Sequence, residues 1–255
     1  MATAATGTSV TKKLSAKARP AGASRPFEHF FFAGMALVIL AVVFRGFART
    51  YFLAGVFRAP LPNLLIHIHG AAFTCWILLL VTQTSLVSAG RVDIHRRLGI
   101  AGFLLACAMV VLGLMAATNT LARGLPLQMD PKTFYAVPML AMVLFATLIF
   151  FAFRERRDPS THKRLILIAT MGLTTAAFGR WPMFRGHLPE ALLMPDVLLA
   201  MLVTYDLWSA RKIHRATLWA GVFLTLVDQL SLPIGRTVAW HAFATWAQPF
   251  GRIFS

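Results

Sequence analysis

The sequence predicts an all-α integral membrane protein, a bundle of about seven transmembrane helices with its N-terminus cytoplasmic and its C-terminus outside. Three observations lead to this fold class. Of the 255 residues, 58% are hydrophobic and 13% are charged, whereas a soluble domain carries about 25% charged residues. The apolar residues form repeated stretches of about 20 residues, the length of a helix that crosses a bilayer. The basic residues gather between these stretches, as in the loops of membrane proteins.

Seven apolar segments follow one another along the chain. Helices are the expected structure, because lipid offers no partner for an unpaired backbone group. The fifth segment differs from the others, since Gly172 and Gly179 interrupt it and Pro182 ends it. The segments are residues 27–47, 62–88, 96–118, 133–153, 164–183, 190–209 and 217–238.

Two tails flank a transmembrane domain at 26–238. Residues 1–25 contain five basic residues and no acid, so we expect a disordered basic tail. This tail also resembles a transit peptide, which leaves an organellar membrane open as an alternative location. Residues 239–255 are rich in aromatic side chains, and we expect them to form an interfacial tail on the outer surface.

The distribution of Lys and Arg predicts the orientation. If the segments alternate, sixteen basic residues fall on the side of the N-terminal tail, which we call side A, and nine on the opposite side B. Cytoplasmic loops carry the excess of Lys and Arg, so side A is predicted to be cytoplasmic. The basic residues of side B are Arg45, Arg49, Arg58, Arg123, Lys132, Arg180, Arg185, Arg236 and Arg252.

The positions of Lys and Arg also indicate the expected partners, and the absence of common enzyme motifs bears on activity. A formal charge of +16 would suggest nucleic acid in a soluble protein, but cytoplasmic loops account for it here. The expected partner is therefore the lipid bilayer and not nucleic acid, and other membrane protein subunits are left open. The sequence has no P-loop, no H-E-x-x-H and no G-x-S-x-G. No catalytic residue is predicted, and enzymatic activity is left undecided.

Three acidic residues lie inside the apolar segments: Asp196, Asp206 and Asp228. An ionisable group inside a membrane is costly, and it marks a functional site by default. Asp206 lies near the side A end of its segment, where we expect it to pair with Lys212 or Arg215. Asp228 lies about 16 Å into the last segment, near the bilayer centre. It is therefore the acid to which we assign a function.

Polar groups of the outer half predict a candidate site. His67 and His69 are two residues apart, so they point to different faces of one helix. The His67 face carries small residues, which favours its packing against another helix, and we expect His67 to be the buried one. We predict that one site for a small solute or a proton is formed by His67, Arg180, Asp196, Asp228 and Arg236. The chain would then be a small-solute or proton-coupled carrier; an interhelical network that only locks the bundle is the structural alternative.

Haem or metal binding is a second functional reading. His95, His162 and His214 each precede a basic residue, directly or within H-K-R, at the side A start of an apolar segment. Imidazole is the commonest ligand of metals and haem, so His95, His162, His214, His67 and His69 are candidate ligands in a membrane redox protein. Cationic neighbours disfavour a metal cation, and the three side A histidines equally suit an anionic headgroup zone. A third reading is a structural or assembly partner in a membrane complex.

Several short motifs carry a resemblance to a known group. They are H-x-H-G at 67–70, Gln83, G-R-x-D-x-H-R-x-L-G at 90–99, and the later elements H-K-R-L, R-W-P and Y-D-L-W at His162, Arg180 and Tyr205. With these motifs the chain resembles a group of uncharacterised bacterial multi-pass membrane proteins over most of residues 60–246. The resemblance implies location in the bacterial inner (cytoplasmic) membrane and assigns no activity or cofactor.

Overall fold

The computed structural model describes residues 26–60, 62–124 and 129–254, and all regular structure in these ranges is helical. Six helical stretches are long and apolar enough to cross a membrane, as expected from six of the seven predicted segments. They are Phe27–Phe52, Leu64–Ser88, Val92–Arg123, Pro131–Arg154, Leu188–Ala210 and Arg215–Gly235. The predicted basic tail at 1–25 lies outside the described residues.

The helices follow the apolar segments closely. In chain order they are α1 (Pro26–Phe47), the π-helix η1 (Ala48–Phe52), α2 (Leu64–Ser88), α3 (Val92–Arg123), α4 (Pro131–Arg154), α5 (Pro159–Gly172), α6 (Thr175–Phe178), the 3-10 helix η2 (Pro182–Phe184), α7 (Leu188–Leu192), α8 (Met194–Ala210), α9 (Arg215–Gly235), α10 (Val238–Ala247) and the 3-10 helix η3 (Gln248–Phe254).

Local capping explains where several helices begin. Asp130 and Asp158 each precede a proline, and their carboxylates accept hydrogen bonds from the backbone N–H of Thr133 and Ser160. A capping side chain satisfies an N–H that has no partner within the helix, and proline fits the first helical position because its N–H is not needed there. The two Asp-Pro pairs therefore start α4 and α5.

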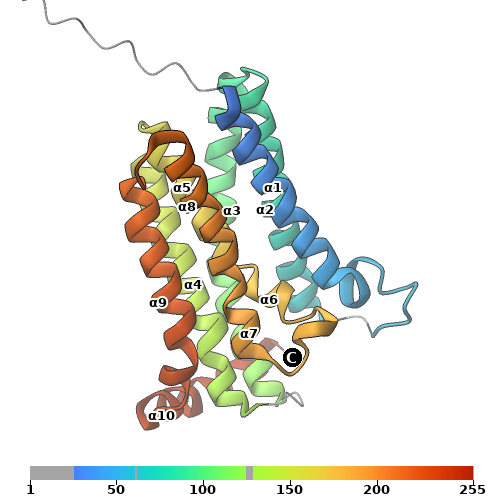
Figure 1. The fold of residues 1–255 in the computed structure, drawn as a ribbon. Coiled ribbons are helices and arrows are strands. Elements are labelled where there is room, and N and C mark those ends of the chain that lie inside the picture. The colour runs from blue at the N-terminus through green and yellow to red at the C-terminus, as the bar shows by residue number, and fades with distance from the viewer. Residues whose placement is uncertain (1–25, 61, 125–128, 255) are drawn as a thin grey trace, which may run out of the picture.

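The long helices run alternately up and down, so consecutive connections lie at opposite ends of the bundle (Figure 1). The start of α1 and the α2–α3, α4–α5 and α8–α9 connections form the side A end, and α10 and η3 lie at the side B end. The centre is α5, which packs against α4, α8 and α9. Almost every residue from Arg164 to Gly172 is buried. The helix that begins with several polar and basic residues therefore lies in the interior of the bundle.

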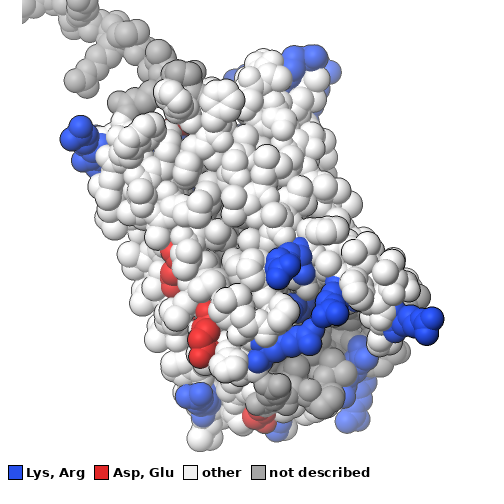
Figure 2. Space-filling view, turned by 45° about the vertical axis from the view of Figure 1, so that its right-hand side comes forward, with Lys and Arg blue, Asp and Glu red and all other residues white. Residues whose placement is uncertain are grey.

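The outer surface of the bundle is apolar. Large hydrophobic side chains from every long helix are exposed, among them Leu37, Leu78, Leu104, Val143, Met201 and Leu226. On the face drawn in Figure 2, basic side chains lie near the upper end and around the lower part, and most of the surface between them is uncharged. Burial of such side chains from water is favourable by about 25 cal/mol per Å². The bundle is therefore compatible with a protein embedded in a bilayer.

The fifth apolar segment is interrupted at the predicted glycine. Helix α5 ends at Gly172, and the N–H groups of Leu173 and Thr174 donate to the carbonyls three residues earlier before α6 begins. Gly172 also lies at a close contact, since a Cβ there would meet side-chain atoms of Leu144 and Leu224. Short 3-10 turns inside a helix mark strain or a hinge. The segment is thus a helix with a tightened turn near its middle.

Candidate functional site

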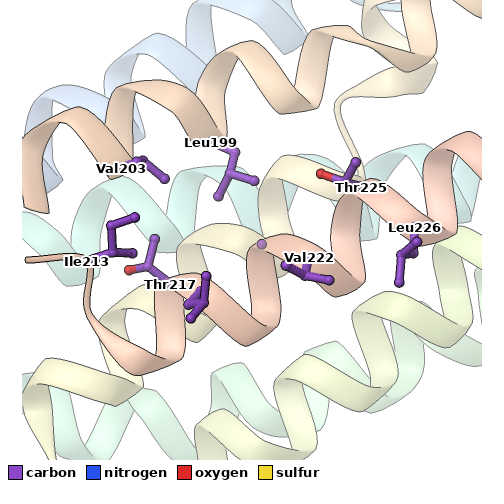
Figure 3. Close-up of a pocket in the computed structure, with 9 residues that line it drawn as sticks. Leu199, Val203, Ile213, Thr217, Val222, Thr225 and Leu226 are labelled. Carbon is purple, nitrogen blue, oxygen red and sulfur yellow. The ribbon is translucent and has the colours of Figure 1, made fainter.

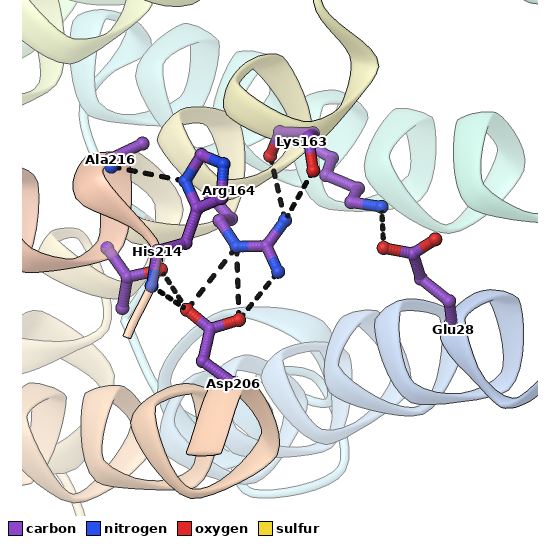
Figure 4. A network of polar contacts seen from close by, with 8 residues as sticks. Glu28, Lys163, Arg164, Asp206, His214 and Ala216 are labelled. Carbon is purple, nitrogen blue, oxygen red and sulfur yellow. Dashed lines mark hydrogen bonds and ion pairs between the residues drawn. The ribbon is translucent and has the colours of Figure 1, made fainter. Parts of the chain in front are cut away.

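A buried ion pair joins α5, α8 and α9 near side A (Figure 4). The Arg164 guanidinium donates to Asp206 Oδ1 at 2.6 Å, and the two side chains are only 6% and 1% exposed. Thr217 Oγ1 and the backbone N–H of His214 donate to Asp206 Oδ2 at 2.6 and 3.0 Å. Beside this group, Lys163 of α5 is paired with Glu28 of α1. The carboxylate is fully satisfied, so this network holds helices together.

The predicted partner of Asp206 was wrong. The sequence suggested Lys212 or Arg215 because both follow Asp206 closely in the chain, but the carboxylate points to Arg164 on α5. The reason is orientation: Asp206 is buried on the inner face of α8, whereas Lys212 is exposed in the connection to α9. A buried carboxylate takes the cation that shares its buried face.

A second polar group, which contains the two acids Asp196 and Asp228, lies on α8 and α9 toward side B. Asp196 accepts hydrogen bonds from Thr225 Oγ1 at 2.6 Å and from Gln229 Nε2 at 3.3 Å. Asp228 is only 3% exposed, and its Oδ2 has no hydrogen-bond partner in the described part of the chain. Thr225 and Gln229 lie on either side of Asp228 in α9, so the Asp196 carboxylate lies beside this stretch of the helix. Asp228 therefore differs from Asp206 in having no ion-pair partner among the residues that the structure describes.

The unpaired carboxyl lies beside the interrupted segment. Leu224, one helical turn before Asp228, packs over Gly172 at the end of α5. Helix α9 contacts both α4 and α5 along this stretch. The tightened turn at Leu173 and Thr174 follows Gly172 directly. A buried acid and a local irregularity of the backbone therefore occur at neighbouring positions of two packed helices.

A groove between α8 and α9 separates the two acidic sites (Figure 3). It has a volume of about 260 Å³ and is lined mostly by aliphatic side chains, with Leu199 lying over Gly221. The two polar residues in its lining are Thr217 and Thr225. Their hydroxyls are committed to Asp206 and Asp196, so the groove itself offers an apolar surface and no free polar group from these two threonines.

Two arginines at side B, Arg45 of α1 and Arg180 in the turn after α6, each lie over an aromatic ring of the other segment. The Arg45 guanidinium lies 5.3 Å from the centroid of the Trp181 ring, and the Arg180 guanidinium lies 4.3 Å from that of Phe47. Arg180 also donates to the carbonyl of Ala176 in its own segment. The His69 ring interacts electrostatically with Arg180 and is hydrogen-bonded to the backbone of Leu112. Arg180 therefore lies within electrostatic range of the His69 ring.

The expected burial of His67 was wrong. His67 is exposed and lies near the hydroxyl of Tyr51 in η1, at 3.3 Å from its Nδ1, whereas His69 is half-buried. The small residues beside His67 do receive a neighbour, since a Cβ at Gly70 would meet the Tyr51 ring. That neighbour belongs to a short helix at the rim of the bundle, so its contact leaves His67 accessible.

The five predicted site residues do not form one cluster. Asp196 lies beside the stretch of α9 that carries Asp228, and His67 and Arg180 lie in separate contacts described above. Arg236 is exposed at the end of α9. A line of contacts nevertheless leads from the acids toward Arg180: Gln229 donates to the Leu192 carbonyl, and Ala191 lies against Gly179.

Two of the candidate haem ligands approach each other. The rings of His95 and His162 lie 6.5 Å apart, edge to face. His162 Nδ1 is 2.8 Å from the Ala152 carbonyl, and Gln83 Nε2 donates to the His95 carbonyl. His95 Nδ1 and Gln83 Oε1 are buried without a partner in the described residues. His214 instead caps α9, accepting a hydrogen bond from the N–H of Ala216. No group of three or more His, Cys, Asp or Glu residues suited to a metal ion occurs in the described ranges.

Comparison with protein-family models, with curated proteins and with solved structures found no match to the chain.

Sequence reasoning missed Arg45, Trp181 and Gln83 as contributors to polar clusters. A signal for the first two is present, because Arg-Gly-Phe at 45–47 and Gly-Arg-Trp at 179–181 both combine a glycine, an arginine and an aromatic residue at the side B end of a helix. The glycine allows close approach, and the arginine can lie on an aromatic ring of the other segment. Gln83 entered the sequence analysis only as part of the resemblance, since nothing in the sequence places it beside His95.

Proposed function

We propose that the chain is a multi-pass protein of the bacterial inner membrane that crosses it seven times, with side A in the cytoplasm and the C-terminus outside. Six stretches are each long enough. The seventh crossing is α5 with α6, residues 159–178, whose 20 residues span about 30 Å as a helix. It leads from the side A end to the side B end (Figure 1). The excess of Lys and Arg on side A supports this orientation.

Reporter fusions test the topology. Alkaline phosphatase fused after Ser255 is expected to be active, and green fluorescent protein at the same position is expected to be dark, because the C-terminus is placed outside. The same reporters fused after Arg211, in the α8–α9 connection, should behave in the opposite way. A fluorescent C-terminal fusion would contradict the seven crossings.

We infer further that the protein is a proton-coupled carrier, with Asp228 as the group that binds the proton. The single observation that carries this proposal is the isolation of Asp228, which is 3% exposed and has an oxygen without a partner. An unpaired carboxylate in such a place is costly. Two species relieve that cost: a proton on the carboxyl, or a cation or hydrogen-bond donor brought by a solute. Exchange between the two is the coupling reaction of a carrier.

Neighbouring features support a change of conformation near Asp228. The tightened turn after Gly172 breaks the regular hydrogen bonding of the central helix next to Leu224. Carriers commonly use interrupted helices at their binding sites, because such turns allow one part of a bundle to move against another. Asp196, held by Thr225 and Gln229, supplies a second negative group that disfavours simultaneous ionisation of both acids.

Transport by reconstituted protein tests the carrier. Proteoliposomes that contain a pH-sensitive dye should show solute-dependent proton movement with the wild-type protein when a panel of small organic and inorganic anions and cations is added. Asp228→Asn should reduce this movement at least tenfold, because the amide cannot exchange a proton. Glu190→Gln is the control, since Glu190 is an exposed acid at the same end of the bundle. Equal flux from both variants would contradict the proposal.

Haem or metal binding by His95 and His162 remains the second candidate, favoured by their 6.5 Å approach. The contact of His162 with the Ala152 carbonyl is the kind of bond that orients a ligating imidazole. A reduced-minus-oxidised absorption spectrum of purified protein, with metal analysis of the same sample, tests this reading. Haem bands lost in His162→Gln would support it, and a featureless spectrum from folded, metal-free protein would argue against it.

A further inference from the structure

We propose that Arg45 and Arg180, together with the segment Thr175–Trp181, form a binding site for an oxyanion, a phosphate or a carboxylate, at side B. The site is separate from the Asp196–Asp228 pair and does not depend on the carrier function. Three observations support it: the absence of acidic partners for these arginines, their contacts with aromatic rings of the other segment, and the unpartnered donors beside them.

Neither arginine is neutralised by an acid. The ion pairs within the described ranges are Arg91–Asp93, Lys163–Glu28, Arg164–Asp206 and His241–Asp130. The three that involve Lys or Arg lie at side A, so no side B arginine in these ranges has a carboxylate partner. Charge clusters of one sign attract counter-ions, and low-dielectric walls strengthen that attraction. Arg45 and Arg180 therefore present uncompensated positive charge at this end.

Close packing of α1 against α6 brings each arginine to an aromatic ring of the other segment. A Cβ at Gly46 would collide with the backbone of Ala177, so the glycine allows the two helices to touch through their main chains. Arg45 then extends over the ring of Trp181, and Arg180 over the ring of Phe47. Each cation lies against an aromatic residue of the other segment, which restricts its orientation. The two arginines are exposed, and the ring contacts favour one orientation of each guanidinium group.

Hydrogen-bond donors beside the arginines lack acceptors. Trp181 Nε1 and Thr175 Oγ1 are buried and have no partner among the described residues. Indole N–H is only a donor, and a hydroxyl can always donate. A group of donors and cations without acceptors is complementary to an acceptor-rich anion.

The guanidinium geometry specifies the class of ligand. The planar fork of arginine matches the paired oxygens of carboxylates and phosphates and can bind them through two parallel hydrogen bonds. In this proposal Arg45 of α1 and Arg180 of the turn after α6 bind one such group together. The same chemistry is offered by a free inorganic or organic anion and by the phosphate of a lipid headgroup, since side B is the end at which lipid headgroups of one leaflet would lie.

Binding measurements on the purified full-length protein test the site. We expect inorganic phosphate to raise the midpoint of thermal unfolding in detergent, at constant ionic strength set with chloride, by ligand linkage. Arg180→Gln and Arg45→Gln should each weaken the apparent affinity about tenfold or more, because a charged hydrogen bond is lost. Trp181→Phe keeps an aromatic ring for Arg45 and removes the N–H, so a smaller loss of about threefold to tenfold is expected. Arg236→Gln is the control, as an exposed side B arginine outside the cluster.

Native mass spectrometry separates the two sources of the phosphate group. An anionic phospholipid that stays bound to the wild-type protein and is lost in Arg180→Gln, with no effect of free phosphate, would assign the site to lipid headgroups. Stabilisation by free phosphate in fully delipidated protein would assign it to a soluble anion. The proposal is overturned if neither ligand binds, or if Arg236→Gln reduces binding as much as Arg180→Gln. Asp228→Asn should leave phosphate binding unchanged, so failure here and failure of the carrier are distinguishable.

Discussion

Replacing Asp206 with Asn is expected to destabilise the bundle strongly. The substitution keeps the size of the side chain but removes the negative charge that faces Arg164, which is buried with Asp206 between α5 and α8. Removal of one partner of a buried ion pair costs about 3–5 kcal/mol, mainly because the remaining charge is left without compensation. The hydrogen bonds from Thr217 and from the His214 N–H would also weaken. We therefore expect a loss near the upper end of that range.

Graded variants check the origin of this loss. Thr217→Val removes one hydrogen bond to a charged group and should cost about 1.5–3 kcal/mol. Lys212→Gln changes an exposed side chain and should shift stability by no more than about 0.5 kcal/mol. The double variant Asp206→Asn with Arg164→Gln should be less destabilised than the sum of the single variants, since neither charge then remains alone.

The free energy of unfolding can be measured by equilibrium denaturation in mixed detergent micelles, followed by tryptophan fluorescence. A loss for Asp206→Asn as small as that for Lys212→Gln would refute the account of the network, because it would mean that the Arg164–Asp206 pair contributes nothing. A loss that is additive with Arg164→Gln would refute the pairing of the two charges.

Two further predictions concern the packing of Gly46 at side B and the titration of His214 at side A. Gly46→Ala should destabilise the protein by about 1–3 kcal/mol, because the new Cβ would collide with the Ala177 backbone. Gly34→Ala in the same helix should stabilise the protein by about 0.5–1 kcal/mol, because no atom of a neighbouring helix lies within 4 Å of a Cβ at that position. Changes of the same sign in the free energy of unfolding of the two variants would contradict this packing. Burial and the Arg164 guanidinium lower the pKa of His214, with Lys163 acting in the same direction and Asp206 and Asp158 opposing. The folded protein thus binds this proton less tightly than the unfolded chain, so the stability is complete above pH ~6.5 and decreases as the pH falls below it. His214→Asn, which can still cap α9, should show a smaller decrease between pH 7 and 5 in parallel unfolding curves, and an unchanged decrease would show that other groups are responsible.

The positions of the helices could be predicted because they depend on local patterns. Apolar runs of the right length and the Asp-Pro pairs at 130–131 and 158–159 identify helices without knowledge of their neighbours. The end of α5 at Gly172 was also predictable. The tightened turn that follows was not, because it accompanies packing of Gly172 against Leu144 and Leu224, which lie far away in the sequence.

The partners of polar side chains were harder to predict. Asp206 is close in sequence to Lys212, but its partner, Arg164, comes from a helix 42 residues away. Which of His67 and His69 is buried depends on the elements that cover each face of α2. The residue that packs on Gly70, beside His67, is Tyr51 of the short helix η1 at the rim of the bundle. Asp228 could be singled out because depth along a helix follows from sequence position alone, and the structure buries it in the bundle. The distances from Asp228 to Arg236 and to His67 cannot be predicted from sequence position in this way.

The most direct test of the central claim is infrared difference spectroscopy of the reconstituted protein during a pH step. The account predicts a carbonyl band of a protonated carboxyl group that changes with pH in the wild-type protein and is absent in Asp228→Asn, while Asp196→Asn shifts the band without removing it. A band that persists unchanged in Asp228→Asn, or no titrating carboxyl band in the wild-type protein, would contradict the role of Asp228 as the proton-binding group.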